Sequence, residues 1–251
     1  MDVESTDPEC ILFSQLDHTH FEELHSLCQL ILSRFPVSEH FFLGIGRSPA
    51  PVIAAIQHIS GKDNATLMPI SFQGYTSSSF NPHMHWKKSV CLYQKFCCYI
   101  PPDKKIVILD WAASGSSLAM AISLMQSFLA ASEFIGLALA KESAHEKIES
   151  NIRITGAICS LCCISPKNSS ILFDSIENGI LKRKLELYPT SSFGLIGAGY
   201  KAVADLEVDP SHNWKIYQLL LAQKMNRLSP INSAADSFFT CHNLTPGVYY
   251  E

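Results

Sequence analysis

An aspartate followed by a run of small residues is the part of the chain best suited to chemistry. Asp110 ends a short apolar run at 106–109, and residues 112–117 carry no bulky side chain. Such a loop lets backbone N–H groups approach an anion, and the N-terminus of a following helix adds further amides. The sequence therefore predicts a phosphate-binding loop, with a plain strand–turn–helix connection as the alternative. The candidate phosphate-binding residues are Ala113, Ser114, Gly115, Ser116, Ser117 and Leu118.

A second loop of similar type occurs earlier in the chain. It follows an apolar run at 39–45 and precedes a helical pattern at 50–59. Arginine offers a planar fork of donors that can bind two oxygens of one anion, and proline is favoured at the start of a helix. The loop is therefore a candidate oxyanion site, and a surface arginine beside a helix start is the alternative. Its residues are Gly46, Arg47, Ser48 and Pro49.

A long polar stretch lies between these two loops. Residues 73–88 are rich in serine and histidine, have little helical pattern, and end with Lys87 and Lys88. A connection of this length without regular structure is often functional in a compact domain. We therefore expect the stretch to take part in the site.

The elements that position these loops alternate between strand and helix patterns, which predicts an α/β fold. We expect a mainly parallel open sheet flanked by helices, with Asp110 at the carboxyl end of a central strand. Predicted strands cover 39–46, 65–72, 89–99, 106–109, 134–140 and 152–164, and predicted helices cover 13–35, 50–59, 118–131, 171–187 and 214–225.

The C-terminal third has a weaker pattern. A glycine-rich turn is predicted at 194–199, and the tail from residue 226 has little periodicity. We therefore expect a core with additions at both ends. The predicted parts are an N-terminal helical segment at 1–38, a core at 39–165, and an accessory part or hood at 166–251 that packs on the same domain.

Composition restricts the class of protein. A hydrophobic share of 47% and a charged share of 17% allow a sizeable core. A net charge of −4 without a long basic run disfavours a broad nucleic-acid surface. The acidic N-terminus lacks the basic region of a signal peptide, and no apolar run reaches the length of a membrane span. Nine cysteines, several in apolar segments, indicate buried thiols and a reducing compartment, the cytoplasm.

The two loops and the polar stretch between them resemble the plan of the type I phosphoribosyltransferases. In that family an apolar strand, acidic residues and a Thr/Gly-rich loop bind phosphoribosyl pyrophosphate. The resemblance covers about residues 40–142. It implies a transferase of nucleotide metabolism, a glycosyltransferase that binds a phosphorylated ribose or nucleotide and releases pyrophosphate.

The resemblance also implies roles for individual residues. Residues 46–49 would be the pyrophosphate loop, and residues 113–118 would hold the 5′-phosphate. Asp110 would orient the ribose hydroxyls and hold Mg²⁺. Arg47, with Lys87 or Lys88 from a closing loop, would stabilise the charge that develops on the leaving pyrophosphate. The family plan leaves a homodimer open and gives no acceptor substrate.

The sequence departs from the family pattern around the aspartate. Leu109 stands where the family has its first acidic residue, Trp111 replaces a small aliphatic residue, and Ala113 replaces an acidic residue found in purine-salvage members. An inactive ligand-binding or regulatory protein on the same fold is therefore one alternative. A methyltransferase that uses S-adenosylmethionine is a second, although the glycine after Asp110 is out of step with that motif.

Overall fold

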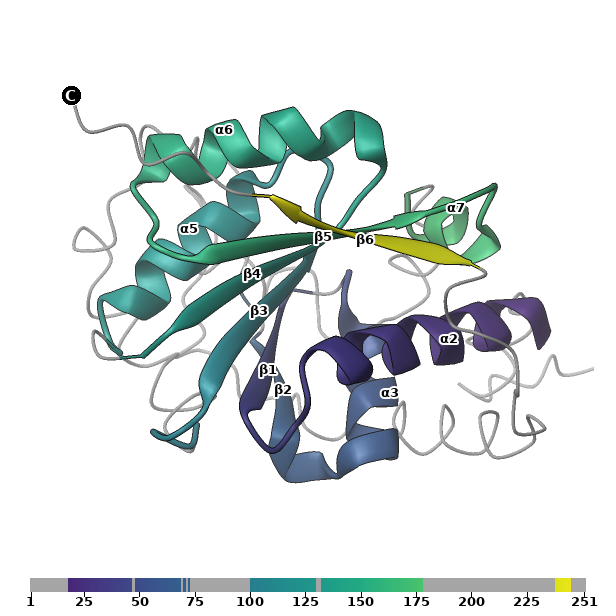
Figure 1. Ribbon diagram of the computed structural model, residues 1–251, viewed down its shortest axis with the longest axis horizontal. Coiled ribbons are helices and arrows are strands. Elements are labelled where there is room, and N and C mark those ends of the chain that lie inside the picture. Colours follow the sequence, from purple (N-terminus) through teal and green to yellow (C-terminus); the bar gives the residue numbers. More distant parts are fainter. Residues whose placement is uncertain are drawn as a thin grey trace, which may run out of the picture.

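The structure is a computed structural model that describes residues 18–46, 48–68, 70, 72, 100–129, 132–177 and 238–244. These residues form one six-stranded sheet in the order β2-β1-β3-β4-β5-β6 (Figure 1). The first five strands are parallel, and β6 pairs antiparallel with β5. The strands are β1 (His40–Ile45), β2 (Ala65–Met68), β3 (Lys105–Trp111), β4 (Phe134–Leu139), β5 (Ser160–Pro166) and β6 (Phe239–Leu244). The expected α/β fold with a mainly parallel open sheet is confirmed.

Helices cover both faces of the sheet because its strands are apolar on both sides. Along β3, Val107 and Leu109 belong to one core, and Ile106 and Ile108 belong to the other. The first core is covered by α2 (His18–Arg34), α3 (Ala50–Ser60) and α7 (Ile171–Glu177), and the second by α5 (Ser116–Gln126) and α6 (His145–Thr155) (Figure 1). Short 3₁₀ turns, η1 (Lys62–Asn64) and η3 (Glu142–Ala144), precede β2 and α6.

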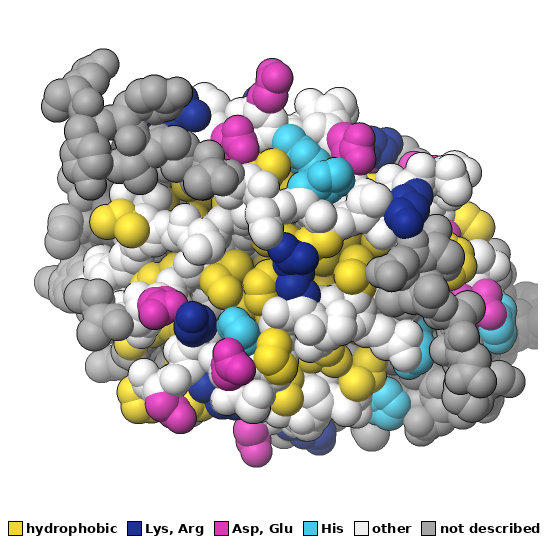
Figure 2. All heavy atoms as spheres, in the orientation of Figure 1, with side chains coloured by type: hydrophobic (Ala, Val, Ile, Leu, Met, Phe, Trp, Pro, Cys, Tyr) yellow, Lys and Arg dark blue, Asp and Glu magenta, His cyan; other side chains and the backbone are white. Residues whose placement is uncertain are grey.

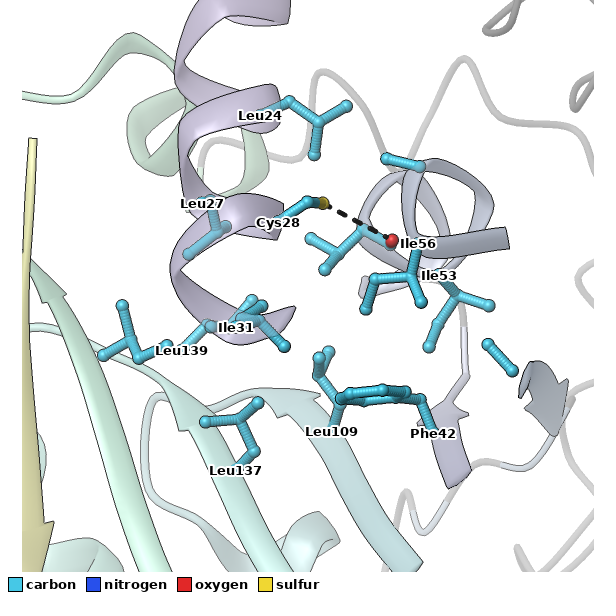
Figure 3. Packing of buried hydrophobic residues seen from close by; sticks show 14 of the residues in the cluster. Leu24, Leu27, Cys28, Ile31, Phe42, Ile53, Ile56, Leu109, Leu137 and Leu139 are labelled. Carbon is cyan, nitrogen blue, oxygen red and sulfur yellow. Dashed lines mark hydrogen bonds between the residues drawn. The ribbon is translucent and has the colours of Figure 1, made fainter. Parts of the chain in front are cut away.

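Helix α2 packs on the sheet through a shared hydrophobic core. Leucine and isoleucine side chains of α2 and α3 point down onto Phe42 of β1 and Leu109 of β3 (Figure 3). The Cys28 thiol of α2 donates to the carbonyl of Val52 in α3, with sulfur and oxygen 3.8 Å apart. Leu27, Phe42 and Leu109 are fully buried, and each such side chain contributes roughly 1.5–3 kcal/mol.

A buried carboxylate joins α2 to α7. Glu23 accepts hydrogen bonds from the Ser170 hydroxyl at 2.6 Å and from the backbone amides of Ile171 and Leu172 at 3.2 and 2.9 Å. The carboxylate of one helix therefore caps the N-terminus of another that lies far away in the sequence. A second contact, between His20 Nε2 and Ser175 Oγ at 2.8 Å, joins the same two helices.

The predicted strand at 152–164 was wrong in its first half. Residues 145–155 form α6, and β5 begins only at Ser160. The helix buries only Ile148 and Ile152, so its apolar pattern is too sparse to be recognised. It ends at Gly156, which adopts the left-handed φ of 66° that favours glycine.

The tail from residue 226, where the sequence has little periodicity, contains one strand, because residues 239–244 form β6. This strand pairs along its whole length with β5, from Phe239 opposite Pro166 to Leu244 opposite Leu161. Its own sequence has little strand signal, and the exposed edge of β5 supplies the partner. The other predicted elements at 89–99, 194–199 and 214–225 lie outside the described residues, as does the predicted helix beyond Glu177.

Candidate functional site

The two candidate loops leave the same edge of the sheet. In the described part of the sheet β1 and β3 are hydrogen-bonded neighbours, with Gly44 opposite Leu109. The helix after β1 covers one face of the sheet and the helix after β3 covers the other. In such an open sheet the loops diverge at this point and leave a crevice outside the carboxyl ends of the strands, where ligands bind.

Asp110 lies at this edge, near the end of β3. Its side chain is buried, with 7% of its surface exposed. Strand alternation puts it on the same face as Ile106 and Ile108, the face covered by α5 and α6. Its neighbours in the sequence serve the opposite core. Leu109 is fully buried beneath α2 and α3 (Figure 3), and the Trp111 ring lies 4.2 Å from the Phe173 ring of α7.

The loop after β3 is held against α6. Gly115 precedes α5 with a left-handed φ of 75°. A Cβ at this glycine would lie 2.9 Å from the Cα of Ile148, so no side chain fits there. Asn151 Nδ2 donates to the carbonyl of Ser114 at 2.8 Å, and the Ser116 amide donates to Ser114 Oγ at 3.4 Å. The small size of Gly115 and Ser114 is therefore explained by packing against α6, whether or not the loop also binds a ligand.

The N-terminus of α5 is the part of this loop suited to an anion. The first amides of a helix have no acceptor within it, and they form the positive end of its dipole. Ser116 and Ser117 are half-buried, Ala113 is exposed, and Leu118 buries its side chain in the core. A ligand could therefore meet only the backbone amide of Leu118.

The loop after β1 is also shaped by its glycine. Gly46 has a left-handed φ of 70°, and its amide donates to the Met68 carbonyl at 2.9 Å. Ser48 is half-buried, and the buried Pro49 is the first residue before α3. Arg47, Lys87 and Lys88 lie outside the described residues, so the structure gives no position for the predicted cations.

A polar cluster that the sequence did not reveal lies where β4 and β5 end. His145 Nε2 is 3.0 Å from Ser165 Oγ, and the rings of His145 and His242 are 5.1 Å apart. His242 Nε2 is 3.3 Å from a carboxylate oxygen of Glu142. The cluster was missed because α6 and β6, which bring the two histidines together, were not recognised.

Among the described residues, the hydrogen bonds of this cluster hold the chain in place and do not activate a nucleophile. Ser165 Oγ donates its proton to the carbonyl of Ala140 at 2.6 Å, so His145 Nε2 is the donor to Ser165. A serine whose proton is held by a carbonyl is not activated as a nucleophile. Burial, and secondarily His242, lowers the pKa of His145 below its usual value. Among the described residues no group of three or more His, Cys, Asp or Glu side chains could hold a metal ion.

No protein-family model, curated protein or solved structure matches this chain. None of the helices in the described ranges is long and apolar enough to cross a membrane. On the face of the molecule in Figure 2, the described Lys and Arg side chains are scattered among acidic and apolar ones.

Proposed function

We propose that this protein binds a phosphorylated ribose compound, phosphoribosyl pyrophosphate or a nucleotide, where β1 and β3 end, and that it transfers the phosphoribosyl group with release of pyrophosphate. One observation carries the proposal: loops 46–49 and 112–115 follow two adjacent parallel strands at the point where their helices diverge. This is where an open α/β sheet binds its ligand. The similarity of both loops to phosphoribosyltransferase loops supports the choice of ligand.

The proposed roles follow from the chemistry of the residues. The N-terminus of α5 binds the 5′-phosphate, because its first-turn amides are donors and its dipole favours an anion. Asp110 accepts hydrogen bonds from the ribose hydroxyls. Arg47 donates to the pyrophosphate, and Lys87 or Lys88 adds a second positive charge. Residues 1–40 or 165–251, apart from the core elements α2, α7 and β6, would supply the hood over the acceptor.

Mg²⁺ fits this set of donors. Magnesium is usually bound by one or two carboxylates together with phosphate oxygens of the substrate. Asp110 supplies one carboxylate, and the apolar Leu109 supplies none. Bound there, the ion would neutralise charge on the leaving pyrophosphate. Asp110 itself orients the ribose in either case.

A ligand-binding protein without turnover is the second candidate. The burial of Leu109 favours it, because the position of the first acidic residue is used for the core beneath α2 (Figure 3). The two candidates share the ligand and differ in reaction. Release of pyrophosphate from phosphoribosyl pyrophosphate in the presence of Mg²⁺ indicates the enzyme. Thermal stabilisation by the ligand without release indicates the binding protein.

Titrations of two variants test the site. A charge-assisted hydrogen bond contributes roughly 1.5–3 kcal/mol, so Arg47→Ala should weaken binding of phosphoribosyl pyrophosphate by about 10- to 100-fold. It should affect ribose 5-phosphate much less, because that ligand lacks pyrophosphate. Asp110→Asn should weaken both ligands, since both carry the hydroxyls.

Arg153→Ala, in the last turn of α6, is the matched control and should bind both ligands as the parent does. Equal losses for both ligands in Arg47→Ala would remove the pyrophosphate loop from the proposal. Binding of S-adenosylmethionine in place of either ligand would support the methyltransferase alternative instead.

A further inference from the structure

Two cysteines on neighbouring strands lie close enough to react with each other. Cys162 is in β5 and Cys241 is in β6, and their sulfur atoms are 3.0 Å apart. Both are free thiols. In the antiparallel register Cys241 is opposite Ile164, and Cys162 is opposite Asn243, so the two cysteines are diagonal neighbours on one face. A disulfide requires the sulfur atoms to move closer by about 1 Å.

The two thiols have different surroundings. Cys162 is buried in the core, whereas Cys241 is half-buried and packs at the edge of that core. Arg34, at the end of α2, donates a hydrogen bond from its guanidinium to Asn243 Oδ1, two residues beyond Cys241. This hydrogen bond holds a positive charge near both sulfurs, and that charge favours the thiolate form of either cysteine.

Cys241 is the less buried thiol of the pair and the one favoured to carry the negative charge. A hydrogen bond from Cys162 and the charge of Arg34 lower the pKa of the Cys241 thiol to about 7. The same hydrogen bond, with burial, raises the pKa of Cys162. Burial raises the pKa of Cys159 to about 11 and that of Cys163 to about 12. Among the described cysteines, Cys241 is the thiol with a lowered pKa, and a thiolate is the nucleophilic form.

We propose that Cys162 and Cys241 form an oxidation site that a hydroperoxide converts to a disulfide between β5 and β6. The Cys241 thiolate attacks one peroxide oxygen, the O–O bond breaks, the other oxygen leaves as hydroxide and takes up a proton to form water, and Cys241 becomes a sulfenic acid. The Cys162 sulfur then attacks the Cys241 sulfur, and the S–O bond breaks with release of water. In total, two thiols lose two electrons and two protons, and hydrogen peroxide is reduced to two molecules of water.

The product would fix the edge of the sheet. Cys241 in β6 is 79 residues after Cys162 in β5. A disulfide between them would link the two strands covalently and keep β6 paired with the sheet. The inference uses only β5, β6 and α2, so it does not depend on the ligand proposed above.

Mass spectrometry of the whole chain tests the proposal. The reduced protein is treated with one equivalent of hydrogen peroxide, quenched with an alkylating reagent and digested. We expect one linked peptide pair that joins Cys162 to Cys241. In Cys162→Ser the sulfenic acid at Cys241 should persist and be trapped by dimedone. Cys163→Ser is the matched control, and it should form the same link as the parent because Cys163 belongs to the opposite core.

A second variant distinguishes an effect of Arg34 on the ionisation of Cys241 from an effect on the folded structure. Arg34→Gln should slow the reaction several-fold at pH 6.5 and restore the parent rate at pH 9, where Cys241 ionises without help. A merely structural effect would change both rates alike and would remove Arg34 from the proposal. The oxidation site is overturned if Cys241 links to another cysteine, or if peroxide gives only sulfinic acid without the link.

Discussion

Gly115 meets two structural demands at the scale of a single residue. Its φ of 75° is one that other residues adopt at a cost, and its missing side chain lets the loop contact Ile148 of α6. The small residues of this loop had suggested either a cradle for an anion or a plain strand–turn–helix connection. Loss of ligand binding in a Gly115 variant would therefore not identify the phosphate site, because the variant would also lose packing.

Replacing Gly115 with alanine should destabilise the protein. A left-handed backbone costs about 1–2 kcal/mol for a residue with a Cβ, and forcing a side chain into a packed contact costs about 1–3 kcal/mol more. Urea unfolding should therefore show a loss of roughly 2–5 kcal/mol.

Gly156→Ala is the matched control, because Gly156 has a similar φ of 66° but no atom within 4 Å of its Cβ. It should lose only the backbone part, about 1–2 kcal/mol. Equal losses in the two variants would contradict the packing role of Gly115.

At the scale of the elements, α7 depends on α2. Helix α7 is seven residues long, and so short a helix is not stable by itself. The Glu23 carboxylate binds two of its first amides and the Ser170 hydroxyl, which itself accepts from the Phe173 amide at 3.1 Å. The Trp111 ring of β3 also packs against Phe173 of α7. The position of α7 therefore follows from contacts with distant elements.

Glu23→Gln should loosen α7 and lower stability. The substitution keeps the size of the side chain but removes the charge and turns one acceptor into a donor, so the loss should be about 1.5–3 kcal/mol. Hydrogen exchange at Leu172 and Phe173 should increase in the same variant.

Glu22→Gln tests the same change one residue away. Glu22 forms a partly exposed pair with His18 at 3.2 Å, and such a pair contributes less than about 1 kcal/mol. If Glu22→Gln and Glu23→Gln were equally destabilised, the capping role of Glu23 would be wrong.

At the scale of the whole molecule, two half-buried histidines should make stability depend on pH. Burial lowers the pKa of His145, with His242 acting in the same direction and Glu142 and Glu149 acting against both. Burial and His58 likewise lower the pKa of His25. The unfolded chain therefore takes up more protons than the folded protein near pH 6, so stability falls as the pH decreases.

The thermal midpoint should be lower at pH 5.5 than at pH 7.5. The contribution of neutral His145 is fully present above its unfolded pKa of about 6.5 and is lost as the pH falls through that value toward the folded pKa. In His145→Gln the difference between the two midpoints should narrow. An unchanged difference in that variant would exclude His145 as one of the groups responsible.

The sequence alone determined the elements whose residues repeat a strong local pattern. The β-branched run of β3, the apolar spacing of α2 and α3, and the glycines that end β1 and precede α5 follow from local propensity and turn chemistry. The α/β class and the position of Asp110 at the end of a strand came from the same patterns. They could be predicted because each depends on contacts within a few residues of the chain.

Only the tertiary structure decided the features that depend on distant partners. The strand β6 forms because β5 offers it an edge, and α6 is held through Ile148 and Ile152 although most of its surface is polar. The capping of α7 by Glu23 and the meeting of Cys162 with Cys241 join residues far apart in sequence. These contacts cannot be predicted from a local sequence pattern. The energy that favours each one arises only when the sheet has brought both partners together.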